Sequence, residues 1–179
     1  LTSYIFEVIK KLKPSWRNEL EIADALQILV EEHKKIIYGI ITDFWKDTGT
    51  PNDIIEANRI ILENLPESFQ GEKEENVLLK GKIIVEQGTS IKKGVKISGP
   101  VIIGENCIIE GNAVINGNTS IGKNSHLSNC NISNSIIMEN CIIEGKLTIK
   151  NSIIASNSKI VKDQNEKKFL LGEGTQISL

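Results

Sequence analysis

Asp47 is the first residue whose setting suggests chemistry. It lies in the stretch FWKDTGTPNDIIEANR, Phe44 to Arg59, inside a tight Thr-Gly turn just before a helix start. A carboxylate in such a turn is placed to meet another group. The alternative is that it hydrogen-bonds its own turn, which turn aspartates commonly do. The sequence therefore raises the question of what Asp47 binds.

The cysteines offer a second chemistry. Cys107, Cys130 and Cys141 form no CxxC pair and leave an odd residue over. This pattern argues against a zinc knuckle and against the disulfide framework of a secreted domain. We expect all three to be buried thiols.

Composition narrows the class of protein. The chain has 179 residues, is 40% hydrophobic and carries 21 basic and 23 acidic residues for a net charge of −2. It is long enough for one medium or two small domains, and no basic block favours nucleic acid. No apolar run reaches the length needed to cross a bilayer, and the first residue is Leu1. We predict a cytoplasmic piece of a longer protein, without nucleic-acid or membrane partners.

The first half has the period of helices. Apolar residues recur at three- and four-residue spacing over Tyr4–Lys13 and again over Leu20–Val30, and Ile36–Ile41 is a candidate strand. After the Asp47 turn, Thr50-Pro51-Asn52-Asp53 predicts a capped helix that runs to Asn64. Pro66 and the polar run that follows it resemble a linker. We therefore predict a first domain over residues 1–68 and a linker over 69–82.

A six-residue period begins at Val85. Aliphatic residues fall at every sixth position, with Gly, Asn and Lys at the turns. A small or apolar residue stands four places after each, with Asn131, after Leu127, as the one poor fit. The aliphatic positions are Val85, Ile91, Ile97, Ile103, Ile109, Ile115, Ile121 and Leu127. This pattern is typical of a parallel β-helix, in which each unit forms one side of a triangular coil.

Aliphatic residues of successive coils stack on one another when three of the six-residue spacings are shortened to five. The predicted walls are Val85, Ile103, Ile121, Ile137, Ile154; then Ile91, Ile109, Leu127, Ile143, Ile160; then Ile97, Ile115, Ile132, Ile149. Cys107 and Cys141 then share an inner column, two coils and about 9–10 Å apart, beyond the roughly 4.4–6.8 Å reach of a disulfide. We predict a β-helix of residues 83–179 that ends in a C-terminal tail, with its coils between Ile83 and Val161.

The chain resembles the sugar-1-phosphate nucleotidylyltransferase family, and within it the long-form glucose-1-phosphate thymidylyltransferases. Three stretches carry the resemblance: KLKPSWRNELEIADAL, FWKDTGTPNDIIEANRIIL and KFLLGEGTQISL. It implies an α+β end of a Rossmann-like nucleotidyltransferase domain, followed by a left-handed parallel β-helix of hexapeptide repeats. It also implies an enzyme whose substrates are a nucleoside triphosphate and a sugar 1-phosphate, and which forms a homo-oligomer.

The resemblance assigns roles to two residues. Asp47 matches one of two aspartates that hold the catalytic Mg²⁺, an ion that proteins bind through one or two carboxylates together with substrate phosphates. Arg17 matches an arginine that contacts phosphates, for which a guanidinium is suited; the alternative is an ion pair with Glu19 or Glu21. Asn18 and Ala23 depart from the family's glycine and threonine.

The family's nucleotide-binding loop and first magnesium aspartate have no counterpart in this chain, so we expect the chain alone to be inactive. One carboxylate and one arginine are too few for phosphoryl-type transfer. Two other readings remain open. Many hexapeptide proteins are acyltransferases, for which His126, predicted to point outward, is the candidate base; a purely structural or oligomerisation role for the β-helix is the third reading.

Overall fold

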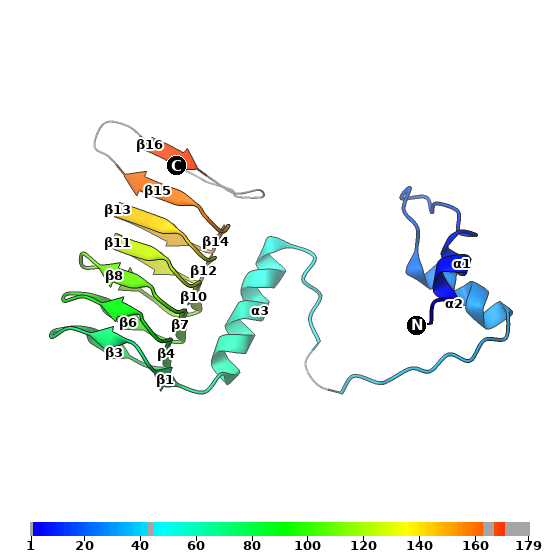
Figure 1. Ribbon diagram of the computed structural model, residues 1–179, viewed down its shortest axis with the longest axis horizontal. Helices are drawn as coiled ribbons and strands as arrows, with labels where there is room; N and C mark the ends of the chain where they lie inside the picture. The colour runs from blue at the N-terminus through cyan, green and yellow to red at the C-terminus, as the bar shows by residue number, and fades with distance from the viewer. Residues whose placement is uncertain (1, 43–44, 163–166, 171–179) are drawn as a thin grey trace. The chain divides into compact units, whose positions relative to one another are not determined.

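The computed structural model describes residues 2–42, 45–162 and 167–170, with residue 162 and the last strand described by their backbone alone. Two compact units divide the chain, Leu1–Trp45 and Lys46–Leu179 (Figure 1). The predicted C-terminal tail lies outside the described residues from position 171 onward. No helix in the described part of the chain is long and apolar enough to cross a membrane.

The first unit contains two helices, α1 (Ile5–Ile9) and α2 (Ile22–Glu31). Both were predicted. Helix α1 begins one residue later and ends four residues earlier than the apolar period, and α2 begins two residues later and ends one residue later. Their apolar faces meet in a small core of Ile5, Val8, Ala25 and Leu29. Because this core is small, the unit also relies on polar contacts.

The predicted strand at Ile36–Ile41 does not form. The segment has no helix or strand assignment, and Ile37 and Ile40 are each 80% exposed. A strand needs a neighbour to receive its backbone hydrogen bonds, and no described residue of this unit supplies one. The prediction from local pattern was therefore wrong for this chain.

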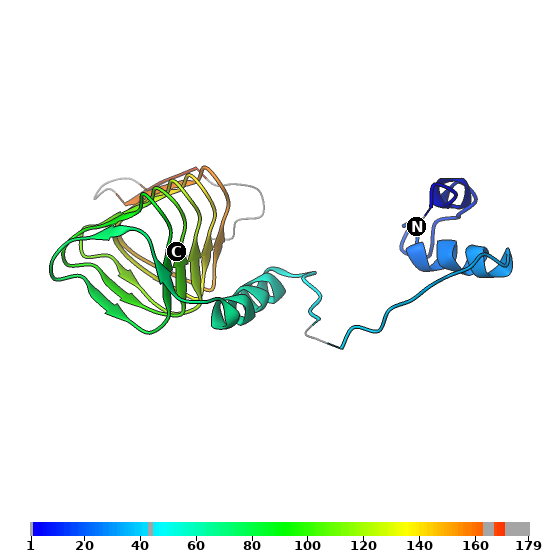
Figure 2. The same ribbon diagram turned by 60° about the horizontal axis from the view of Figure 1, so that its bottom comes forward.

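The second unit begins with helix α3 (Pro51–Asn64), whose bounds are those predicted. It continues into a parallel β-helix, seen nearly end on in Figure 2. The first wall is a sheet of β1 (Ser68–Phe69), β4 (Ile83–Val85), β7 (Val101–Ile103), β10 (Thr119–Ile121), β12 (Ile136–Ile137) and β14 (Ile153–Ile154). Six stacked strands correspond to about five turns of the coil.

The other two walls join into one sheet. The second wall contains β2 (Glu72–Lys73), β5 (Ser90–Ile91), β8 (Ile108–Glu110), β11 (His126–Ser133), β13 (Ile142–Lys150) and β15 (Lys159–Lys162). The third contains β3 (Leu78–Lys80), β6 (Lys96–Ser98) and β9 (Val114–Ile115), and continues into β11 and β13, which run through the corner. Strand β16 (Lys167–Leu170) pairs antiparallel with β15 and so covers the edge that the last coil presents.

The predicted linker at residues 69–82 is wrong. Strands β1, β2 and β3 pair in parallel with β4, β5 and β6, so the first coil starts at Ser68. Its sequence lacks the aliphatic period because it lies at the open end of the coil. Phe69, stacked on Val85, is 40% exposed there, and Lys73 occupies the position opposite Ile91.

The three predicted walls are confirmed residue by residue. Ile121, for example, is 2% exposed and lies between Ile103 and Ile137 in neighbouring coils. One detail differs: Cys130, not Asn131, occupies the inner column after Leu127, because the five-residue spacing shifts the strand by one position. The interior is therefore a continuous aliphatic stack.

The cysteines are buried and free, as predicted. Cys107 and Cys141 share a column with hydroxyl residues: Thr89 Oγ1 accepts a hydrogen bond from the Cys107 amide at 2.9 Å, and Ser125 Oγ accepts one from the Cys141 amide at 3.1 Å. Burial raises the pKa of the Cys107 and Cys141 thiols and raises that of Cys130 to about 11. The thiols therefore serve as small core side chains.

Candidate functional site

The predicted Thr-Gly turn has no turn assignment in the structure; residues 46–49, called the Asp47 turn below, are irregular and lead into the start of α3. Thr50 is the N-cap: its hydroxyl accepts a hydrogen bond from the Asp53 amide, and the Asp53 carboxylate accepts one from the Thr50 amide, each at 3.2 Å. Pro51 follows in the first helical turn, where its missing amide hydrogen costs nothing. Lys46 closes the turn with an ion pair to Asp53 at 2.9 Å.

These contacts set the charges of the turn. The hydrogen bond from Thr50 and that from Lys46 hold the pKa of Asp53 below its ordinary value. The same Asp53 carboxylate raises the pKa of Lys46. Asp53 is thus the residue that both caps the helix and forms the ion pair with Lys46.

Asp47 itself is exposed. Within the part of the chain that the structure describes, its carboxylate accepts no hydrogen bond and forms no ion pair within 4.0 Å, although its charge acts at longer range on Lys46. The alternative in which Asp47 serves only to bond its own turn therefore finds no support in the hydrogen bonding. A free carboxylate stands at the start of a rigidly capped helix.

The helix is in turn attached to the β-helix. Asn58 donates a hydrogen bond to the carbonyl of Asn118 at 3.1 Å and accepts one from the Ser120 hydroxyl. Lys82 donates to the carbonyl of Glu63 at 2.6 Å. The predicted first domain, 1–68, is thus divided differently in the structure, because α3 packs with the coil (Figure 1).

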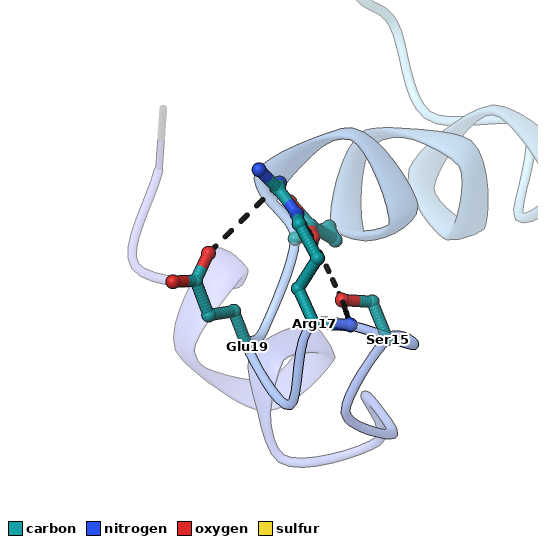
Figure 3. Close-up of polar contacts among 4 residues, drawn as sticks. Ser15, Arg17 and Glu19 are labelled. Carbon is teal, nitrogen blue, oxygen red and sulfur yellow. Dashed lines mark hydrogen bonds and ion pairs between the residues drawn. The ribbon is translucent and has the colours of Figure 1, made fainter. Parts of the chain in front are cut away.

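Arg17 forms an ion pair with Glu21. The guanidinium donates to both Glu21 oxygens at 2.8 Å, and Glu19 lies farther away at 3.9 Å (Figure 3). Ser15 completes the cluster by donating to Glu21 at 2.8 Å and accepting from the Arg17 amide. The pKa of Glu21 is lowered, first by Arg17 and then by Ser15. Of the two partners left open by the sequence, the structure selects Glu21.

His126 points outward from β11, as strand alternation predicts. Its Nε2 lies 2.8 Å from Glu110 and its Nδ1 lies 3.7 Å from Glu144, which come from the coils on either side. Both ring nitrogens therefore face carboxylates. The two glutamates were not singled out from the sequence, although the repeat period places them beside His126.

The residues brought together do not by themselves form a metal site. Among the described residues, no group of three or more His, Cys, Asp or Glu side chains is arranged to hold an ion. A single exposed carboxylate still fits Mg²⁺, since that ion is usually held by one or two carboxylates and completed by waters and substrate phosphates. Arg17 and Asp47 belong to different units of the chain.

Two family models match separate parts of the chain. Residues 1–64, which include both Arg17 and Asp47, match the Nucleotidyl transferase family, and residues 97–178 match the family described as the GMPPB C-terminal domain. The first part of the chain is thus similar to nucleotidyl transferases, and the second match lies largely within the parallel β-helix.

Several curated proteins are similar to part of the chain. Over 88 residues the chain is 38% identical to a glucose-1-phosphate thymidylyltransferase of Streptomyces griseus, covering 49% of this chain and 25% of that protein. It is 44% identical over 85 residues to the bifunctional protein GlmU of Methanocaldococcus jannaschii, covering 47% and 20%. It is 42% identical over 79 residues to the low-salt glycan biosynthesis nucleotidyltransferase Agl11 of Haloferax volcanii, covering 44% and 22%.

The chain thus spans a quarter or less of the length of these relatives. Among solved structures, the acetyltransferase domain of PglB from Neisseria gonorrhoeae superposes with a TM-score of 0.42 at 16% identity, covering 68% of each chain.

Proposed function

We propose that this chain is the C-terminal portion of a sugar-1-phosphate nucleotidylyltransferase that joins glucose 1-phosphate to dTTP. In this reaction a phosphate oxygen of the sugar phosphate bonds to the α-phosphorus of dTTP, the bond from that phosphorus to the β-phosphate oxygen breaks, and pyrophosphate leaves. The products are dTDP-glucose and pyrophosphate. The thymidylyltransferase relatives, both matched over half of the chain or slightly less, support this choice.

The observation that carries the proposal is the free Asp47 carboxylate. Thr50 and Asp53 satisfy the helix start between them, which leaves Asp47 without a partner in the described residues and directed by a capped turn. Asp47 would hold Mg²⁺ together with a carboxylate and phosphates from outside this chain. When bound, Mg²⁺ neutralises charge on the phosphate oxygens.

Arg17 is proposed to contact substrate phosphates, in which role it exchanges Glu21 for a phosphate. A guanidinium can bind either the planar Glu21 carboxylate or a tetrahedral phosphate through two parallel hydrogen bonds. In the complete protein, Arg17→Lys keeps the charge but loses the fork, so the KM for the nucleotide should rise. An unchanged KM would restrict Arg17 to its ion pair with Glu21.

The acyltransferase alternative is weaker in this structure. A general base needs a ring nitrogen free to take a proton from the substrate, and both nitrogens of His126 face glutamates. An oligomerisation role for the β-helix is compatible with the transferase, and we propose a cytoplasmic homo-oligomer.

The substrate test uses the complete protein and measures pyrophosphate release. We expect release with dTTP and glucose 1-phosphate, and less with UTP. We expect none from the 179-residue chain alone, because positioning and charge neutralisation by several groups carry phosphoryl transfer. A complete protein that releases no pyrophosphate with any pairing of nucleoside triphosphate and sugar 1-phosphate would refute the proposal.

A further inference from the structure

Helix α3 presents one face to the β-helix. Ile55, Asn58 and Leu62 are three and four residues apart, which places them on the same side of a helix. Ile55 is 6% exposed and Leu62 is 1% exposed, whereas Ile54 and Ile61, on another side, are 40% and 57% exposed. The helix is therefore seated by a defined face, with Asn58 in its middle.

The sheet beneath it carries a matching column. The outward positions of successive coils on the first wall are Ser68, Ile84, Ile102, Ser120, Ile136 and Ile153. Ile84 is only 7% exposed although it faces away from the coil interior, and α3 is the helix that runs along this sheet (Figures 1 and 2). Four members of the column are isoleucine. Of its two serines, Ser68 lies in the first coil, and Ser120, in the middle of the wall, is the one that meets Asn58.

That polar pair fixes a register. The Asn58 side chain uses both ends of its amide: the oxygen accepts from the Ser120 hydroxyl and the nitrogen donates to the Asn118 carbonyl. An aliphatic ladder alone would allow the helix to slide along the coil axis. A half-buried amide left without hydrogen-bond partners is destabilising, so a helix displaced by one coil is disfavoured.

The far end of the helix is held as well. The Lys82 ammonium donates to the Glu63 carbonyl in the last turn of α3, where the carbonyls have no partner within the helix and a cation is favourable. With its middle and its C-terminal end fixed, the position of the N-terminal end follows. That end carries the Thr50 cap and, three residues earlier, Asp47.

We propose that the β-helix positions the Asp47 carboxylate through α3, with Asn58 as the positioning residue and Ser120 as its contact on the coil. The part that concerns catalysis rests on the proposed function of Asp47. The β-helix is then a structural reference for the metal-binding turn of the transferase, in addition to any role in assembly. Changes at Ser120 act on the turn without touching the substrate.

The first experiment follows the turn without catalysis. The chain has two tryptophans, and Trp45 lies two residues before Asp47. In a Trp16→Phe background, acrylamide quenching and anisotropy of Trp45 report the order of the turn. Asn58→Ala and Ser120→Ala should each raise quenching and lower anisotropy. The double variant should be no worse than Asn58→Ala alone, because removing Asn58 already removes its contact with Ser120.

Ser98→Ala is the matched control, since it makes the same change at an outward position of β6 in the other sheet. It should leave Trp45 unchanged, and circular dichroism should show all variants folded. If Asn58→Ala and Ser120→Ala leave Trp45 as the control does, the proposal is overturned.

The second experiment uses the complete enzyme and titrates Mg²⁺. Displacing a catalytic group by about 1 Å can cost on the order of a hundredfold in rate. We therefore expect Asn58→Ala to lower kcat by about tenfold or more and to raise the Mg²⁺ concentration at half-maximal rate, with Ser98→Ala unchanged. If Trp45 loosens but the Mg²⁺ requirement stays as in the wild type, the positioning role is refuted. If Asp47→Asn has no effect, the proposed function fails instead, and the Trp45 result still decides whether the coil orders the turn.

Discussion

Thr50 and Asp53 form a reciprocal capping box at the first turn of α3. The threonine hydroxyl accepts a hydrogen bond from the Asp53 amide, and the Asp53 carboxylate accepts one from the Thr50 amide. Because this pair completes the helix start, the cap does not use the Asp47 carboxylate. The division of tasks between Asp53 and Asp47 is the central feature of the site.

Thr50→Ala should destabilise the start of α3 by about 1 kcal/mol, observed as a loss of helical signal in urea unfolding.

Thr50→Ala should also alter acid unfolding. The pKa of Asp53 is depressed from 3.8, first by Thr50, so ionised Asp53 stabilises the fold above pH 3.8 and loses that effect as the pH falls through its folded pKa. Without Thr50 the loss should occur at a higher pH. Thr148→Ala, an exposed change on β13, serves as the control; identical acid profiles for the two variants would count against the capping role.

Ile121→Asp should unfold the β-helix. The change puts an unpaired charge between Ile103 and Ile137 in a stack that is closed to water. Ile108→Asp makes the same change at an outward position of β8 that is 42% exposed and should alter stability by less than about 1 kcal/mol. Thermal unfolding followed by circular dichroism compares the two. Two variants of equal stability would contradict the assignment of Ile121 to the interior and Ile108 to the outer face.

The three walls could be predicted because each repeats an aliphatic residue at a fixed period. Each coil needs such a residue because its inward side chains are buried against those of the next coil. The first coil could not be predicted, since at the open end Phe69 and Lys73 need not be fully buried and the period is lost. The strand at Ile36–Ile41 failed for the opposite reason: its local pattern is suitable, but pairing depends on a distant neighbour. Asn58 and Ser120 are separated by 62 positions and no local pattern joins them, although a serine in a column of isoleucines was a usable signal.

The three thiols should not react with Ellman's reagent in the native chain and should all react in denaturant. Each is buried and its pKa is raised by burial, to about 11 for Cys130. A raised thiol pKa means that stability is complete below the unfolded value of 9.0 and declines as the pH rises from there to about 11. Urea midpoints between pH 7 and pH 11 check the second part. Rapid labelling of the native chain at neutral pH would contradict the inner placement of the column.

His126→Ala should not abolish an acyl transfer, because we expect none. The measurement is release of free coenzyme A from acetyl-coenzyme A with amino-sugar phosphates as acceptors, with the wild-type chain and the variant compared. Turnover by the wild type that disappears in His126→Ala would make His126 a catalytic base and reverse the ranking of the two functions.

The most direct test of the central claim is Asp47→Asn in the complete enzyme, with pyrophosphate release from dTTP and glucose 1-phosphate measured against Mg²⁺ concentration. Asparagine suits such a turn as well as aspartate does, so the melting temperature should change little, while the loss of a metal-binding carboxylate should lower the rate by orders of magnitude and leave a residual rate that needs more Mg²⁺. A rate and a Mg²⁺ dependence equal to those of the wild-type enzyme would contradict the account and leave Asp47 as an ordinary residue of the turn.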